Sequence, residues 1–200
     1  MGSRFPRRRK GSPACGFPRR RRGRNVIVFR HADPRFPFLW EALAQPPARW
    51  HGLGEGPVHY FAETPDGAWA EFLRQEEISD PADLAGVARS LWSIEMPRPP
   101  RARPRLDTAI LMGGISTYDD CQREARRMRA GGRRGLVAPS AALQPGTASG
   151  FRTERGLHAG PRRAERVFVL FGPRPDLVGW AACNKGRPRD DLLPRVRPLR

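Results

Sequence analysis

The chain has few cysteines and no long apolar run, and each shortage excludes a class of protein. Its 200 residues include three cysteines, Cys15, Cys121 and Cys183, without C-x-x-C spacing. An odd, scattered set is typical of neither a disulfide framework nor a zinc site, so we expect reduced thiols. The longest apolar runs, 26–29 and 167–171, are far shorter than the roughly 20 residues that a membrane-spanning helix needs. The N-terminus also lacks the apolar stretch of a secretory signal, and we expect a cytoplasmic protein without a membrane partner.

The short motifs of common nucleotide-binding and hydrolytic sites are missing as well. The sequence contains no G-x-x-x-x-G-K-[ST] phosphate loop, no G-x-S-x-G nucleophile motif and no H-E-x-x-H zinc motif. Its four histidines, His31, His51, His59 and His158, do not have the pair spacing that puts two metal ligands on one helix face. We therefore expect neither a metal nor a bound cofactor.

Positive charge is abundant but unevenly distributed. The chain has 37 Lys and Arg against 20 Asp and Glu, yet residues 1–24 hold ten basic residues and no acidic one, which leaves +7 for residues 25–200. Residues 1–24 also contain Pro and Gly and little apolar surface to bury, so we expect a disordered Arg-rich tail. A nucleic-acid-binding arm is the alternative. The absence of interleaved aromatic residues, which would stack on bases, makes nucleic acid the weaker interpretation.

Residues 25–198 have the length and patterning of one mixed domain. Thr64 is placed as an N-cap and Pro65 as the first helical residue, ahead of an amphipathic helix. Apolar runs predict strands at 26–29, 58–61, 91–96, 136–138, 167–171 and 177–180, helical spacing predicts helices at 66–74 and 118–130, and residues 141–163 are expected to form a long loop. The fold class is therefore α+β, with about six short strands and two or three helices.

Four residues are candidates for a site, although each also fits an ordinary structural role. Glu71 lies among apolar neighbours on the predicted helix, and Tyr60 ends the strand before it. Arg49 precedes a loop with three glycines, where a guanidinium fork could bind phosphate. Ser140 follows a predicted strand end. Taken singly, Glu71 also fits a solvated helix glutamate, Tyr60 a half-buried strand tyrosine and Ser140 a turn serine, and Arg49 is one of many arginines.

Taken together, four segments resemble the RES-domain proteins, which are known chiefly as toxins of Xre-RES toxin-antitoxin modules. The segments are Ala-Arg-Trp at 48–50, Pro-Val-His-Tyr-Phe-Ala at 57–62, Ala-Trp-Ala-Glu at 68–71 and Ala-Pro-Ser at 138–140. Arg49, Tyr60 and Glu71 are each eleven residues apart, which is similar to the family spacing. The resemblance extends over residues 25–198. It departs from the family at Pro47-Ala48 and His51, where Gly-Gly and Asn are common.

The resemblance implies a fold like that of the ADP-ribosyltransferase toxins and an enzyme that cleaves the nicotinamide–ribose bond of NAD. Glu71 would stabilise the ribosyl cation, Arg49 would bind the pyrophosphate, Tyr60 would pack on the nicotinamide or its ribose, and Ser140 would orient that ribose. NAD is then a substrate rather than a cofactor.

The acceptor and the partners stay open at this point. Water would make a glycohydrolase, inorganic phosphate a phosphorylase, and a protein side chain an ADP-ribosyltransferase. The resemblance further implies an Xre-type helix-turn-helix antitoxin as partner. A non-enzymatic basic protein that binds nucleic acid through residues 1–24 is the alternative from another class.

Overall fold

The computed structural model describes residues 25–200, so the predicted disordered tail of residues 1–24 lies outside the described residues. The strands are β1 (Val26–Ala32), β2 (Val58–Ala62), β3 (Arg89–Met96), β4 (Gly135–Pro139), β5 (Phe151–Thr153), β6 (Leu157–Ala159), β7 (Arg166–Phe171) and β8 (Val178–Gly186). The α-helices are α1 (Pro65–Gln75), α2 (Thr108–Leu111) and α3 (Tyr118–Ala130), with 3-10 turns η1 (Pro81–Gly86), η2 (Ile115–Thr117) and η3 (Asp190–Arg195). In the part of the chain that the structure describes, no helix is long and apolar enough to span a membrane.

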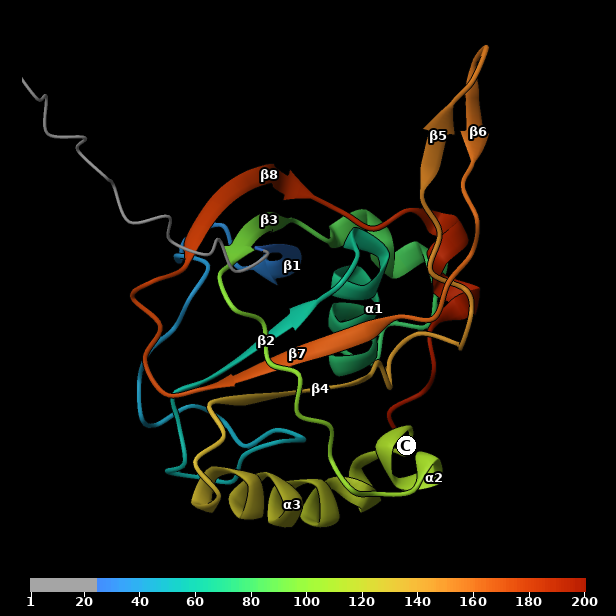
Figure 1. Ribbon diagram of the computed structural model, residues 1–200. Helices are drawn as coiled ribbons and strands as arrows, with labels where there is room; N and C mark the ends of the chain where they lie inside the picture. The colour runs from blue at the N-terminus through green and yellow to red at the C-terminus, as the bar shows by residue number, and fades with distance from the viewer. Residues whose placement is uncertain (1–24) are drawn as a thin grey trace, which may run out of the picture.

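Six of the strands form one antiparallel sheet in the order β4-β7-β2-β1-β3-β8 (Figure 1). The sheet consists of two three-stranded halves, because β1 and β2 meet at a single register pair, Phe29 opposite Ala62. This arrangement confirms the predicted α+β domain. The predicted strands and both predicted helices are present, and the second helix has the predicted bounds, 118–130.

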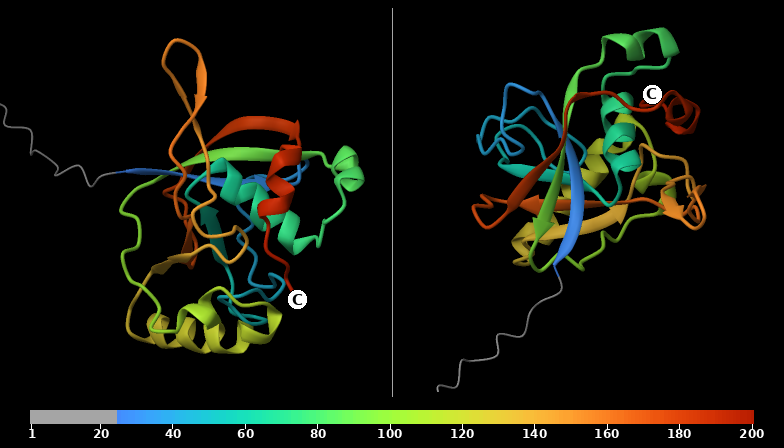
Figure 2. Two further views of the ribbon diagram at one scale, coloured as in Figure 1. Left: turned by 90° about the vertical axis from the view of Figure 1, so that its right-hand side faces the viewer. Right: turned by 90° about the horizontal axis from the view of Figure 1, so that it is seen from above.

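The prediction of a long loop over residues 141–163 is wrong. This segment contains a second, two-stranded sheet in which β5 and β6 pair over three residues each. The hairpin projects from the body of the molecule (Figures 1 and 2), and all six of its strand residues are exposed. Strands of three residues are too short to show an alternating pattern, and this hairpin has no buried face to impose one. That is why the sequence did not reveal it.

Helices α1 and α3 pack on the same face of the sheet. Along β2, Val58, Tyr60 and Ala62 point to that face, where Val58 packs with the core under α3 and Ala62 packs with the core under α1. Phe61 points the other way, into a third core that Phe38 partly covers. The seam between α1 and α3 is therefore the place where side chains from both helices and from the strand ends can meet.

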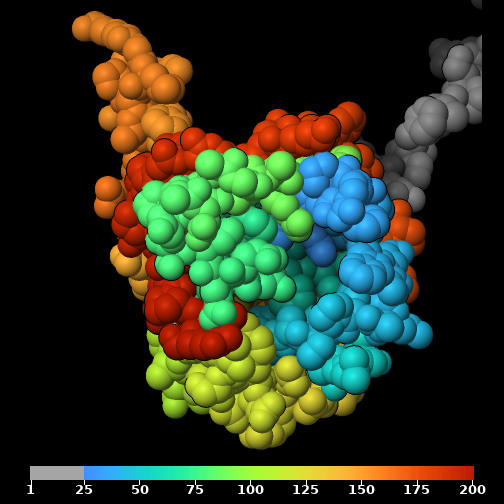
Figure 3. All heavy atoms as spheres, turned by 180° about the vertical axis from the view of Figure 1, so that it is seen from behind, coloured from blue at the N-terminus to red at the C-terminus, as the bar shows by residue number. Residues whose placement is uncertain are grey.

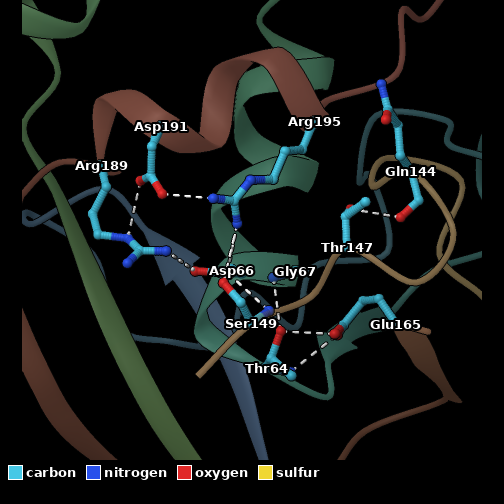
Figure 4. A network of polar contacts seen from close by, with 10 residues as sticks. All are labelled: Thr64, Asp66, Gly67, Gln144, Thr147, Ser149, Glu165, Arg189, Asp191 and Arg195. Atoms are coloured by element: carbon cyan, nitrogen blue, oxygen red, sulfur yellow. Dashed lines mark hydrogen bonds and ion pairs between the residues drawn. The ribbon is translucent and has the colours of Figure 1, made fainter. Parts of the chain in front are cut away.

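The N-terminus of α1 is fixed by buried polar contacts (Figure 4). Thr64 is the predicted N-cap, and its hydroxyl accepts a hydrogen bond from the Gly67 amide at 3.0 Å. The same hydroxyl donates to the Glu165 carboxyl group at 2.7 Å, which also accepts from the Thr64 amide at 3.0 Å. A Cβ on Gly67 would lie 2.3 Å from Glu165 Oε1, so this close approach requires glycine. Asp66 extends the network to Ser149 at 3.1 Å.

Replacing Glu165 by Gln should remove part of the pH dependence of stability. Burial raises the pKa of Glu165 from 4.5 to about 7, so between these values the folded chain holds a proton that the unfolded chain releases. The free energy of unfolding should therefore fall as the pH rises from about 4.5 to 7, and Glu165→Gln should lose this contribution. Chemical denaturation across that range measures it. Glu154→Gln, on the exposed hairpin, is the control, and an equal slope in both variants would contradict the assignment.

Candidate active site

The fold brings the side chains of Glu71 and Ser140 into contact. Glu71 projects from the middle of α1, and Ser140 follows the last residue of β4. The Ser140 hydroxyl donates to Glu71 Oε1 at 2.9 Å, and the Ala142 amide donates to that hydroxyl at 3.2 Å. The serine is therefore oriented by the main chain toward one oxygen of the carboxylate. Two residues that the sequence nominated separately form one hydrogen-bonded pair.

The electrostatic environment of Glu71 has opposing contributions. Burial raises the pKa of Glu71, while the hydrogen bond from Ser140 and the positive charges of Arg74 and Arg49 lower it. The net direction is upward, although the side chain is only half-buried. The three neighbours thus act to keep a negative charge in a poorly solvated place.

Arg49 is buried, and its guanidinium group is already engaged. One nitrogen, Nη1, donates to the carbonyl of Ile110 at 3.2 Å and to the hydroxyl of Thr117 at 3.2 Å, and Nη2 donates to the carbonyl of Gly113. The guanidinium carbon also lies 4.9 Å from the centre of the Tyr118 ring, a cation–π contact. The structure therefore places Arg49 near Glu71, but its donors point at main-chain carbonyls at the end of α2 and just after it.

Tyr60 binds the turn that carries Arg49. Its hydroxyl accepts from the Trp50 amide at 3.0 Å and contacts His51 Nδ1 at 2.8 Å. Burial raises the pKa of Tyr60, so the phenol stays neutral. Within residues 25–200 the structure shows no hydrogen bond between Tyr60 and Glu71, and the predicted packing of Tyr60 on a substrate stays a prediction.

The face of the molecule opposite that of Figure 1 is hollowed beside α1. Figure 3 shows the depression between the blue segment that follows β1 and the green segment that follows α1, with teal atoms of β2 and α1 visible inside it. The red C-terminal residues lie at the edge of the same face, against the green and yellow-green segments.

In a comparison with protein families, residues 27–156 match the RES domain. The chain belongs to this RES domain family. The match includes Arg49, Tyr60, Glu71 and Ser140 of the candidate site.

Among solved structures, this RES domain is similar to a chain in the crystal structure of the M. tuberculosis MbcT–MbcA toxin-antitoxin complex. The similarity covers 86% of this chain and 88% of that one, with a TM-score of 0.56 and 14% sequence identity. At this identity the likeness concerns the fold. The comparison with curated proteins finds no match.

Sequence reasoning missed two residues at the site of this RES domain. Arg74, one turn after Glu71 on α1, is buried and donates to the carbonyl of Gly113 at 2.7 Å. Tyr118 begins α3 and lies over Arg49; burial raises its pKa. The spacing of Glu71 and Arg74 on one helix was a signal that could have nominated the arginine. Nothing in the sequence ties Tyr118 to α1.

Proposed function

We propose that this RES domain cleaves the nicotinamide–ribose bond of NAD and transfers the ADP-ribosyl group to water or to inorganic phosphate. The observation that carries this proposal is the Ser140–Glu71 hydrogen bond beside two buried arginines, Arg49 and Arg74. A carboxylate suits the cationic ribosyl centre, and guanidinium groups suit the pyrophosphate.

The reaction needs charge placement more than a strong nucleophile. As nicotinamide leaves with the bonding electron pair, the ribose becomes oxocarbenium-like, and a nearby carboxylate stabilises it. Glu71 supplies that carboxylate when ionised, and Ser140 holds one of its oxygens in place. The products with water are nicotinamide, ADP-ribose and a proton; the products with phosphate are nicotinamide and ADP-ribose phosphorylated at the anomeric carbon.

The test is to incubate the full purified chain with NAD, in the presence and absence of inorganic phosphate, and to identify the adenosine-containing product. We expect NAD to be lost and one of the two products above to form. Label from NAD found on protein would instead make it an ADP-ribosyltransferase. Deletion of residues 1–24 should leave NAD consumption intact. Salt-sensitive nucleic-acid binding lost with that deletion, in a protein that leaves NAD untouched, would replace the proposal by the non-enzymatic alternative.

The proposed activity leads us to expect a protein that inhibits this enzyme. An enzyme that depletes NAD in the cytoplasm would harm its own cell, and a chain of similar fold belongs to a toxin-antitoxin complex. We propose an Xre-type antitoxin that covers the site and competes with NAD. Titrating the product of the neighbouring gene while following NAD binding tests this, and simultaneous full occupancy by both would refute competition.

A further inference from the structure

Three arginines from different parts of the chain bind the same short stretch of main chain. Arg49 Nη1 donates to the carbonyl of Ile110 at 3.2 Å, Arg74 Nη2 to that of Gly113 at 2.7 Å, and Arg197 Nη2 to that of Met112 at 3.0 Å. The positive charges of Arg49 and Arg197 both act on Arg74, against the negative charge of Glu71. The group thus holds more positive than negative charge, and carbonyl dipoles provide the remaining compensation.

The segment that supplies these carbonyls is anchored by apolar side chains in its first part only. Residues 107–117 run over the surface from the start of α2 to the start of α3, and Met112 is their only buried residue. Ile110 and Leu111 pack partly buried against the core under α3, whereas residues 113–117 have no buried side chain, so polar contacts hold that second part in place. The arginines on its inner side are nevertheless almost inaccessible, since 8% of Arg49 and 5% of Arg74 are exposed.

The last residues of the chain fasten this segment from outside. The Ile115 amide donates to the Leu199 carbonyl at 3.1 Å, and Arg74 Nε donates to the Pro198 carbonyl at 3.1 Å. A Cβ on Gly114 would lie 2.3 Å from the Leu199 carbonyl oxygen, so the contact depends on glycine. Residues 197–199 therefore connect α1 with the 107–117 segment, on the face shown in Figure 3.

We propose that Arg74 joins Arg49 in binding the pyrophosphate of NAD, and that the carbonyls of residues 110–113, latched by residues 197–199, occupy both arginines until the substrate displaces them. This inference rests on the proposed function. In this proposal, residues 107–117 cover the two arginines until NAD takes their place. Residues 197–199 hold this cover closed.

The exchange would replace neutral acceptors on the two arginines by charged ones. Phosphate oxygens carry full charge, and hydrogen bonds from arginine to them are stronger than those to neutral carbonyls. A closed cover still weakens binding, because the apparent dissociation constant is the intrinsic one divided by the open fraction. Any change that loosens the latch without altering the arginines should therefore strengthen binding.

Gly114→Ala is the sharpest test, because the added methyl group would collide with the Leu199 carbonyl, its next neighbour is the Cα of Arg200 at 3.7 Å, and neither Arg49 nor Arg74 is among its nearest atoms. We expect the KM for NAD and the dissociation constant for inorganic pyrophosphate each to fall about fivefold, the factor that losing one hydrogen bond puts on an opening equilibrium. A chain that ends at Arg197 loses both the Leu199 and the Pro198 contacts, so both constants should fall at least as far, and this second variant guards against a folding defect in the substituted protein. Gly86→Ala is the matched control: its Cβ would meet nothing within 4 Å, and neither constant should change.

Arg74→Gln completes the experiment. It should weaken pyrophosphate binding at least about tenfold, both alone and combined with Gly114→Ala, because a charge-assisted contact is lost. Unchanged or weaker pyrophosphate binding in both Gly114→Ala and the shortened chain would overturn the latch. Equal binding by Arg74→Gln would overturn its role. If pyrophosphate responds as expected while no variant consumes NAD, the proposed function fails and the anion site with its latch stands.

Discussion

Glu71→Gln is expected to reduce the rate of NAD consumption by roughly 10²- to 10³-fold, the usual cost of removing one electrostatic contact to a transition state. Gln retains the shape and can still accept the hydrogen bond that Ser140 donates to Glu71 at 2.9 Å, but it carries no charge to stabilise the ribosyl cation. Steady-state assay of NAD loss measures the effect, which should lie in kcat rather than in KM because the contact strengthens in the transition state.

The control for this substitution is Glu76→Gln, an exposed glutamate at the end of the same helix. It should retain the parent rate, and both variants should show the parent's thermal transition. A Glu71→Gln enzyme within about threefold of the parent would contradict any electrostatic role for this carboxylate, since each tenfold is only about 1.4 kcal/mol.

Arg49→Lys is expected to lower kcat/KM for NAD about tenfold or more, although the charge is retained. The two terminal nitrogens of Arg49 reach different partners, Ile110 and Gly113, and a lysine ammonium cannot reproduce that fork. The melting temperature should fall as well, because the carbonyls of Ile110 and Gly113 lose a charge-assisted donor. Kinetic assay and thermal denaturation measure the two effects.

Arg123→Lys provides the comparison for Arg49→Lys. Arg123 is exposed on α3 and pairs with Asp120 three residues earlier, and such surface pairs contribute little. Neither kinetics nor melting temperature should change. Parent-like kinetics in Arg49→Lys would remove Arg49 from the substrate site and leave it a purely structural role.

Local patterns predicted the elements well where a buried face imposed them. The helix over 118–130 and the cap at Thr64 follow from side-chain periodicity and capping chemistry, which act over a few residues. Strand β1 was predicted to end at Phe29 because Arg30 and His31 interrupt the apolar run. It continues to Ala32 because β3 pairs with it along its full length, a tertiary effect that the sequence does not display.

The sequence predicted which residues belong to the candidate site, but not the contacts that these residues make. Glu71 and Ser140 are 69 positions apart, and only the folded sheet brings the end of β4 beside α1. Arg49 was predicted to bind a phosphate group, whereas its partners are carbonyls in and just after α2, a helix of four residues that is too short to show a periodic pattern. Arg74 can be assigned to the site only from its hydrogen bond to the Gly113 carbonyl, which the sequence does not show.

The single register pair between β1 and β2 gives α1 a second task. The helix contacts both strands and therefore acts as a cross-brace between the two halves of the sheet. The proposed catalytic carboxylate, Glu71, lies on this same helix. The sequence of α1 must therefore preserve both the packing of the two half-sheets and the site. Amino-acid substitutions should therefore accumulate slowly in α1 and quickly in the β5–β6 hairpin, whose strand residues are all exposed. An inserted peptide tag should be tolerated in the β5–β6 hairpin and should disrupt the protein in α1.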